Sequence, residues 1–166
     1  MTTPQARRAP ARIRAAVTDD AEAVWRVHTS SIRGLCAGWY TEQEIAVWTG
    51  RLIAEAYRRA IEAHVMLVAE RDGAVVGFGE LDLQGGEIVA VYVMPEAAGT
   101  GVGSDLLAHL EEAARAAHHV RLTLCASLNA EAFYAHRGWR AGAREKHRLT
   151  PGVAVDCVRM DKALPA

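Results

Sequence analysis

The spacing of apolar residues along the chain changes between two periods, and this predicts the order of helices and strands. A short apolar stretch at 13–17 predicts a strand, and helical spacing follows over 18–32 behind acidic residues suited to a helix N-terminus. Glycines interrupt that spacing, so 34–40 is predicted as a loop or a broken helix. A Thr-x-x-Glu capping box then opens a helix predicted over 41–63.

The middle of the chain is predicted to form three consecutive antiparallel strands. Extended patterns cover 65–70, 74–83 and 87–94, and an Asp-Gly pair, favoured in tight hairpins, joins the first two. In the third stretch, residues of both parities are apolar from 88 to 94. This is typical of a strand that is covered on both faces and lies in the middle of a sheet.

The last third of the chain combines helices and strands again. An amphipathic helix is predicted over 102–117, a strand over 120–126 and a short helix over 129–137. A hairpin with strands at 139–149 and 153–160 closes the pattern. The alternation of helical and extended segments predicts an α/β (α+β) fold.

Composition indicates one soluble globular domain. The chain has 166 residues, of which 51% are hydrophobic and 23% charged, and we expect a tail at 1–11 before a single domain at 12–166. The net charge of −1 gives no overall attraction to nucleic acid or to an anionic membrane surface, so neither is expected as a partner. The longest wholly apolar run, 88–94, is far shorter than the ~20 residues that cross a bilayer.

The cysteines and histidines show no metal-binding pattern. Cys36, Cys125 and Cys157 are widely spaced and odd in number, so we expect neither a zinc site nor a disulfide framework, and a reducing cytoplasm fits best. The seven histidines have no metal-ligand spacing, and no metal is expected. A homodimer remains possible.

A glycine-rich turn between a buried strand and a helix is the main candidate for chemistry. Gly99, Gly101 and Gly103 allow an anion to approach main-chain N–H groups at the positive end of a helix. A flexible turn without a ligand is the alternative. A P-loop is excluded because the turn contains no lysine, and the dinucleotide fingerprint is a poor match because its third glycine is missing.

Two motifs resemble the GNAT (GCN5-related N-acetyltransferase) superfamily. The segment 98–103 is similar to its Gln/Arg-x-x-Gly-x-Gly/Ala signature, and 127–139 resembles its Asn-Ala-x-x-Phe-Tyr-x-x-x-Gly-Phe segment. The resemblance extends from Ile13 to Met160 and implies a mixed, mostly antiparallel sheet of six to seven strands with helices on both faces. One departure is that Ala98 occupies the Gln/Arg position.

This resemblance implies acetyl-CoA as co-substrate, with its pyrophosphate on the amides of the turn and its thioester arm beside the preceding strand. Ala98 lacks a side-chain contact that relatives have, so weaker CoA affinity is expected. The cofactor-binding residues implied are Val91, Tyr92, Val93, Ala98, Gly99, Thr100, Gly101, Val102, Gly103, Ser104, Asn129 and Tyr134.

The resemblance also suggests catalytic residues. Tyr134 matches a tyrosine near the CoA sulfur and could protonate the leaving thiolate, although it could also only pack the short helix. Glu87 resembles in spacing a glutamate that serves as base, with Glu80, Asp82 or an ordered water chain as rivals. The oxyanion donor would be a main-chain N–H near Val93.

The acceptor site is expected between the first two helices and the last hairpin. Candidate substrate residues are Arg33, Trp39, Tyr40 and Glu80, and Trp48 is assigned to the core rather than to a pocket. The predicted function is acetyl-CoA-dependent N-acetyl transfer to a primary amine of a small molecule or protein, by direct attack on the thioester. The alternative is a non-catalytic acyl-CoA-binding or regulatory module of the same fold.

Overall fold

The computed structural model describes residues 9–165, and residues 1–8 of the predicted tail at 1–11 therefore lie outside the described residues. The strands are β1 (Arg12–Ala15), β2 (Val65–Arg71), β3 (Ala74–Asp82), β4 (Glu87–Val93), β5 (Arg121–Ser127), β6 (Arg140–Thr150) and β7 (Val153–Ala163). The helices are α1 (Ala21–Leu35), α2 (Glu42–Gly50), α3 (Ala54–Ala63), α4 (Val102–Ala116) and α5 (Glu131–Ala135).

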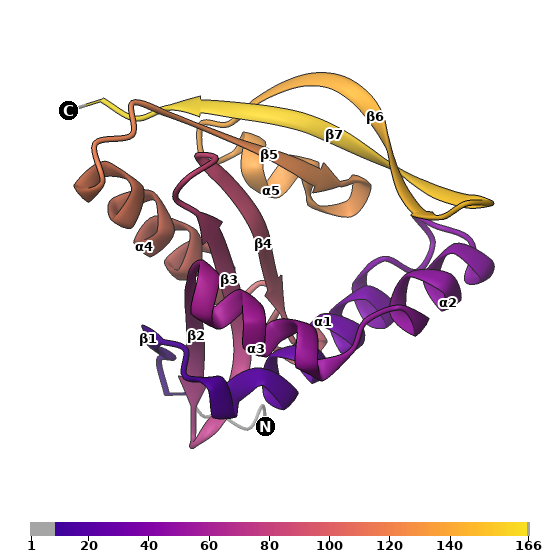
Figure 1. Ribbon diagram of the computed structural model, residues 1–166, viewed down its shortest axis with the longest axis horizontal. Coiled ribbons are helices and arrows are strands. Elements are labelled where there is room, and N and C mark those ends of the chain that lie inside the picture. Colours follow the sequence, from indigo (N-terminus) through magenta and orange to yellow (C-terminus); the bar gives the residue numbers. More distant parts are fainter. Residues whose placement is uncertain (1–8, 166) are drawn as a thin grey trace, which may run out of the picture.

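All seven strands join one sheet in the order β1-β2-β3-β4-β5-β7-β6 (Figure 1). Neighbouring strands are antiparallel except β4 and β5, which are parallel. The predicted mixed, mostly antiparallel sheet is confirmed, as is the run of three antiparallel strands in its middle. Asp72 and Gly73 take the positive φ angles that the tight turn between β2 and β3 requires.

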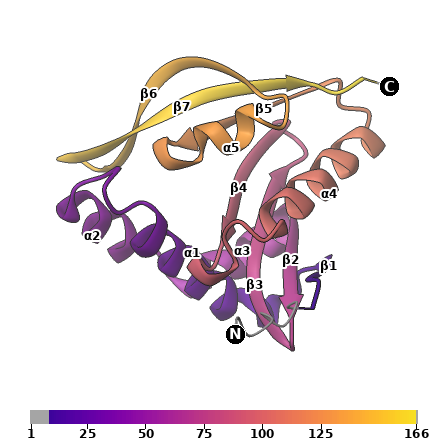
Figure 2. The same cartoon turned by 180° about the vertical axis from the view of Figure 1, so that it is seen from behind.

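Helices cover both faces of this sheet (Figures 1 and 2). Apolar residues of α1 and α3, such as Val24 and Tyr57, pack on one face against Val68 and Phe78. Helix α4 and the short α5 lie on the other face, where residues such as Leu110 join a second apolar cluster. Among the described residues, no helix has both the length and the apolar character needed to span a bilayer.

The predicted interruption at 34–40 begins later than expected. Helix α1 continues through Gly34 to Leu35. A Cβ at position 34 would lie 2.5 Å from Cγ of Pro95, so this position of the helix requires glycine. The glycine permits close packing between α1 and the segment after β4. The sequence showed the missing side chain but not the neighbour that requires its absence.

The predicted single helix over 41–63 is wrong. The capping box is present, with the Glu44 amide donating to Thr41 Oγ1 at 3.1 Å, but α2 ends at Gly50 and α3 starts at Ala54. At the break, Trp25 Nε1 donates to the carbonyl of Leu52 at 3.0 Å. This side chain satisfies a main-chain acceptor that the break leaves without a helical partner.

Strands β4 and β5 pair over only two positions and then separate. The pairs are Glu87 with Thr123 and Ile88 with Leu124, although β4 continues to Val93 and β5 to Ser127. On its other side β4 carries a bulge, because Ala90 and Ile88 face consecutive residues of β3. A bulge bends the strand. The sheet therefore opens between its two central strands, as Figure 1 shows.

The expectation of no disulfide is wrong for two of the three cysteines. Cys125 on β5 and Cys157 on β7 form a disulfide, with their Cα atoms 5.8 Å apart. Spacing along the chain gave no sign of this because the two strands are neighbours only in the folded sheet, where Ser127 faces Cys157. The inference of a reducing compartment rested partly on the absence of this bond and loses that support. Cys36 is free and buried.

Candidate active site

Two cavities meet where β4 and β5 separate. The first, here called the glycine cavity, has a volume of about 360 Å³ and includes Gly99, Gly101 and Gly103 in its lining. The second, the carboxylate cavity, has a volume of about 440 Å³ and includes Glu80 and Glu87. Tyr92 and Ser127 line both. The two cavities therefore adjoin at these two residues.

The glycine turn leaves its main chain open to the first cavity. Gly99 and Gly101 have φ angles of 71° and 90°, and Gly101 is the residue that precedes α4. A Cβ added at either position would meet no other atom within 4 Å. The N-terminus of α4, with its partial positive charge, is thus accessible to an anion.

Most of the cofactor-binding residues expected from the sequence line the glycine cavity. Thr100 and Val102 do not: Thr100 Oγ1 donates to the carbonyl of Ala97 at 2.5 Å, and Val102 is buried in the core. Their side chains point elsewhere, although their amides remain part of the turn. The predicted residues that line the cavity are Val91, Tyr92, Val93, Ala98, Gly99, Gly101, Gly103, Ser104, Asn129 and Tyr134.

Arg137 is a residue that the sequence analysis missed. Its guanidinium lies 3.9 Å from the ring centroid of Phe133, donates through Nε to Ser104 Oγ at 2.8 Å and through Nη1 to the Phe133 carbonyl at 2.9 Å. It also lines the glycine cavity. Arg137 therefore supplies a positive charge beside the start of α4, where Ala98 supplies none. The sequence feature that could have pointed to it is that Arg137 is the one arginine or lysine within the motif at 127–139.

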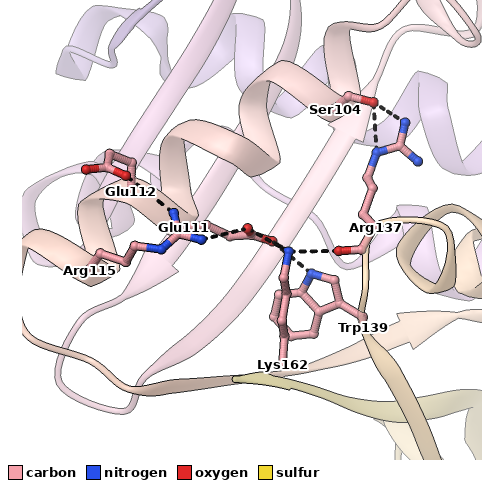
Figure 3. A network of polar contacts seen from close by, with 7 residues as sticks. All are labelled: Ser104, Glu111, Glu112, Arg115, Arg137, Trp139 and Lys162. Atoms are coloured by element: carbon pink, nitrogen blue, oxygen red, sulfur yellow. Dashed lines mark hydrogen bonds and ion pairs between the residues drawn. The ribbon is translucent and has the colours of Figure 1, made fainter. Parts of the chain in front are cut away.

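A polar network holds the chain around Arg137 against α4 (Figure 3). Lys162 on β7 donates to the Arg137 carbonyl at 2.7 Å and to the buried carboxylate of Glu111 on α4 at 2.8 Å. Trp139 Nε1 donates to the same carboxylate at 3.0 Å. Paired and hydrogen-bonded in this way, Glu111 is a buried charge that the fold tolerates. The network fixes the segment after α5 relative to the helix that follows the glycine turn.

Tyr134 is buried in the core and also lines the glycine cavity. The residue is 6% exposed, packs edge-on against Phe133 and Trp139, and its hydroxyl makes no hydrogen bond within 9–165. Burial raises the pKa of Tyr134 above its ordinary value. The phenol consequently keeps its proton at neutral pH and can donate it to a group bound in the cavity.

Asn129 is oriented by the free cysteine. Cys36 Sγ donates to Asn129 Oδ1 at 3.4 Å, and burial raises the pKa of Cys36 to about 11. The sulfur is thus a thiol at neutral pH. With its oxygen engaged in this contact, Asn129 can offer its NH₂ group to the glycine cavity.

The carboxylate cavity brings Glu80 and Glu87 to one face of the sheet. Glu80 on β3 pairs with Ala90 on β4. The bulge at Val89 shifts the register of β4, so Glu87 points to the same face of the sheet as Ala90 and Glu80. Glu87 Oε1 lies 3.1 Å from Nη1 of Arg159, which also pairs with Glu145. Glu80 is more deeply buried and has a different partner, since its Oε1 lies 2.6 Å from His64 Nδ1.

One wall of the carboxylate cavity is aromatic and uncharged. His28 Nδ1 is 2.7 Å from the Tyr57 hydroxyl, and the His28 ring lies 4.1 Å from that of Tyr92, with Phe78 beside them. Burial lowers the pKa of His28 to about 3, so the imidazole is neutral. His28 Nε2 is buried without a hydrogen-bond partner. The sequence assigned His28 no role because its spacing is that of an ordinary core position.

The predicted substrate residues are divided by the fold. Tyr40 and Glu80 line the carboxylate cavity. Trp48 packs edge-on against Tyr40 and lines the same cavity. Trp39 lines the glycine cavity instead and is 58% exposed. Arg33 is exposed on α1 and lines neither cavity, so the fold does not bring it together with the other predicted substrate residues.

Comparisons with known proteins give a consistent family. Residues 36–162 match the family model described as an acetyltransferase (GNAT) domain. A GCN5-related N-acetyltransferase from Rhodopseudomonas palustris, described as a class-II aminotransferase, is 31% identical with a TM-score of 0.87, and the match covers 95% of this chain and 98% of that one. No curated protein matches.

Two further solved structures share the fold. PaiA N-acetyltransferase from Thermoplasma acidophilum, in complex with coenzyme A, is 22% identical with a TM-score of 0.78, covering 93% of this chain and 99% of that one. Ribosomal-protein-alanine N-acetyltransferase from Brucella melitensis is 27% identical with a TM-score of 0.68, covering 92% and 99%. With a family match over most of its length and a relative of 31% identity that covers nearly all of it, the chain belongs to the GNAT family of acetyltransferases.

Proposed function

We propose that this protein is an acetyl-CoA-dependent N-acetyltransferase that moves an acetyl group to a primary amine of a small molecule or protein, and that residues 12–166 form its single domain. The observation that carries this proposal is the meeting of two cavities at Tyr92 and Ser127, between separated strands. A thioester entering from one cavity and an amine from the other can reach each other there. Relatives with coenzyme A or acetyl-CoA bound support the donor.

The residues of the glycine cavity fit the donor. The amides at Gly99 to Ser104 and the N-terminus of α4 would hold the pyrophosphate, and the open space at both positive-φ glycines leaves room for it. Arg137 adds a charge-assisted contact to these neutral donors. Acetyl-CoA supplies the activated acyl group, and the chain supplies its position and the proton transfers.

Arg137→Met should weaken CoA binding roughly 10- to 100-fold, because a charge-assisted hydrogen bond contributes about 1.5–3 kcal/mol. Calorimetry with CoA at two salt concentrations measures this, and the difference between wild type and variant should shrink at high salt. Arg140→Met is the matched control, since Arg140 is exposed and pairs with Asp161 away from the cavity. Equal affinities of wild type and Arg137→Met would show that the main chain alone holds the anion.

The transfer needs a base for the amine and an acid for the leaving thiolate. Tyr134 is the proposed acid. For the base, the two candidates differ in their distance from Tyr92 on β4. Glu80 on β3 pairs with Ala90, which is two residues from Tyr92, while Glu87 on β4 is five residues from Tyr92. At ~3.3 Å per residue these separations are about 7 Å and about 16 Å along the strand. Glu80 is therefore nearer to the junction of the cavities than Glu87, the first candidate from the sequence.

Glu80→Gln should lower kcat/KM by about 10²-fold at neutral pH, because it removes the base while keeping the shape of the side chain. The loss should diminish as pH rises towards the pKa of the acceptor amine, where the free amine predominates. Glu87→Gln is the matched variant and should lose less, since Arg159 already occupies its carboxylate. The reverse ranking in a pH–rate series would assign the base to Glu87.

The alternative of a non-catalytic acyl-CoA-binding module rests on Ala98, which leaves the family's usual side-chain contact unmade. Release of free thiol from acetyl-CoA distinguishes the two. The acceptors tested are butylamine, 2-phenylethylamine, 1,4-diaminobutane and an alanyl tripeptide with a free N-terminus. Amine-dependent release supports the transferase. CoA binding without release with any of the four supports the module.

A further inference from the structure

We propose that Glu80 and His64 form the route by which the proton lost from the acceptor amine leaves the carboxylate cavity for solvent. The inference rests on the proposed function, because it assigns a path to a proton that N-acetylation must release. It names His64 as a residue of the reaction that acts through Glu80 and does not itself touch the acceptor.

Glu80 forms the inner end of this route. It lies on β3, lines the carboxylate cavity, and its side chain is only 10% exposed. Oε1 is 2.6 Å from His64 Nδ1, whereas Oε2 makes no hydrogen bond or ion pair in the part of the chain that the structure describes. One oxygen is therefore available to an amine in the cavity, while the other contacts an imidazole.

His64 forms the outer end. It lies between α3 and β2, and its side chain is 30% exposed. It does not line the carboxylate cavity but a separate hollow, together with Asp82, Leu83 and Gln84. The hydrogen bond between Glu80 and His64 thus connects the inner cavity to this second hollow. An imidazole suits this position because it can accept a proton on one nitrogen and release one from the other.

Three other polar groups of the cavity, on His28, Tyr57 and Glu87, are less suited to this role. Burial lowers the pKa of His28 to about 3 and raises the pKa of Tyr57 above its ordinary value, so this hydrogen-bonded pair stays neutral and holds no extra proton. Glu87 is paired with Arg159. Within 9–165, Glu80 is the carboxylate of the cavity that contacts an imidazole.

The charges around His64 favour passage of a cation. Glu80 faces it from β3, and Asp82, at the end of the same strand, lines the same hollow. Oδ1 of Asp82 accepts from the amides of Gln84 and Gly85, which keeps this carboxylate at the turn after β3. Both of these side chains are acids, and among the described residues no lysine or arginine lines that hollow.

The proton steps balance as follows. The amine nitrogen bonds to the thioester carbon, and the positively charged nitrogen of the adduct loses one proton to Glu80. At rest the Nδ1–H of His64 donates to the Glu80 carboxylate. Once Glu80 is protonated, exchange with solvent at the exposed ring moves the imidazole proton to Nε2 and frees Nδ1. The carboxylic acid then passes its proton to Nδ1, which restores the carboxylate and gives an imidazolium, and the imidazolium releases its Nε2 proton to water, which restores the starting tautomer. The departing thiolate receives a different proton, from Tyr134.

The test measures thiol release from acetyl-CoA with the fastest of the four amines, at low buffer concentration, for His64→Ala and His64→Gln. Both should lower kcat about tenfold or more. The amide of His64→Gln can still hydrogen-bond Glu80 but cannot relay a proton. Added imidazole should restore His64→Ala in proportion to its concentration and should not affect wild type. His109→Ala, an exposed histidine bonded only to the carbonyl of Asp105, is the control.

Wild-type kcat in His64→Gln would overturn the route and leave His64 as a hydrogen-bond partner alone. A loss in His64→Ala that imidazole does not restore would overturn it equally. If the wild type releases thiol with none of the amines, the proposed function fails and the route fails with it. If the wild type turns over and the His64 variants have the same kcat, the proton route is overturned and the proposed function stands.

Discussion

Tyr134→Phe is expected to lower kcat by about 10²- to 10⁴-fold, the range over which a positioned general acid contributes. The phenyl ring keeps the packing against Phe133 and Trp139, and only the proton donor is lost. Because the hydroxyl makes no hydrogen bond within the described residues, the free energy of unfolding should hardly change. CoA affinity, measured by calorimetry, should stay close to that of wild type.

The pH dependence of the wild type provides a second test of this residue. Burial raises the pKa of Tyr134 above 10, its ordinary value, so the folded protein retains the acid form across neutral and mildly alkaline pH. The rate at saturating substrate should therefore not fall between pH 7 and about 9 through loss of this proton. If Tyr134→Phe were as active as the wild type, the thiolate would leave without a proton from the protein.

Gly101→Val is expected to abolish measurable CoA binding, a loss of at least about 100-fold. Valine is strongly disfavoured at a φ of 90°, so the turn before α4 must change to accept it. In addition, the new side chain would occupy the open space through which an anion reaches the amides. Calorimetry with CoA up to millimolar concentration measures the loss.

Gly73→Val is the matched control for that substitution. Gly73 also has a positive φ, of 75°, and a Cβ there also meets no atom within 4 Å, but it lies in the turn between β2 and β3 and lines neither cavity. Both variants should lose stability through backbone strain. Only Gly101→Val should lose CoA. Similar losses of CoA affinity in both would mean that general destabilisation, and not the turn, explains the result.

The sequence predicted the elements well where periodicity is strong and poorly where tertiary contacts decide. The central strands and α4 were located within a residue or two by their apolar spacing. The break after Gly50 and the continuation of α1 through Gly34 were not. The contacts found at these two places, from Trp25 and from Pro95, come from distant parts of the chain and are not visible in local apolar spacing. The disulfide was missed for the same reason.

For the candidate site, the sequence predicted where the main-chain turn lies but not which side chains face the cavities. The spacing of the glycines located the turn, but whether Thr100 and Val102 face the cavity depends on how the turn folds back on Ala97 and the core. His64 is remote from every motif and contacts Glu80 only because α3 returns the chain to the start of β2. Local patterns carry no information on such contacts.

Beyond Ile88, the edge of β4 that faces β5 has no partner strand. At the rim of a sheet, such an edge would invite a second protein chain to add itself and would favour aggregation. Here the unpaired edge lies inside the sheet, with β5 and β7 on the far side of the opening. A narrow ligand that fills it would complete the sheet. Exchange of the β4 amides with deuterated solvent should therefore slow on ligand binding, making the co-substrate a temporary part of the protein's own architecture.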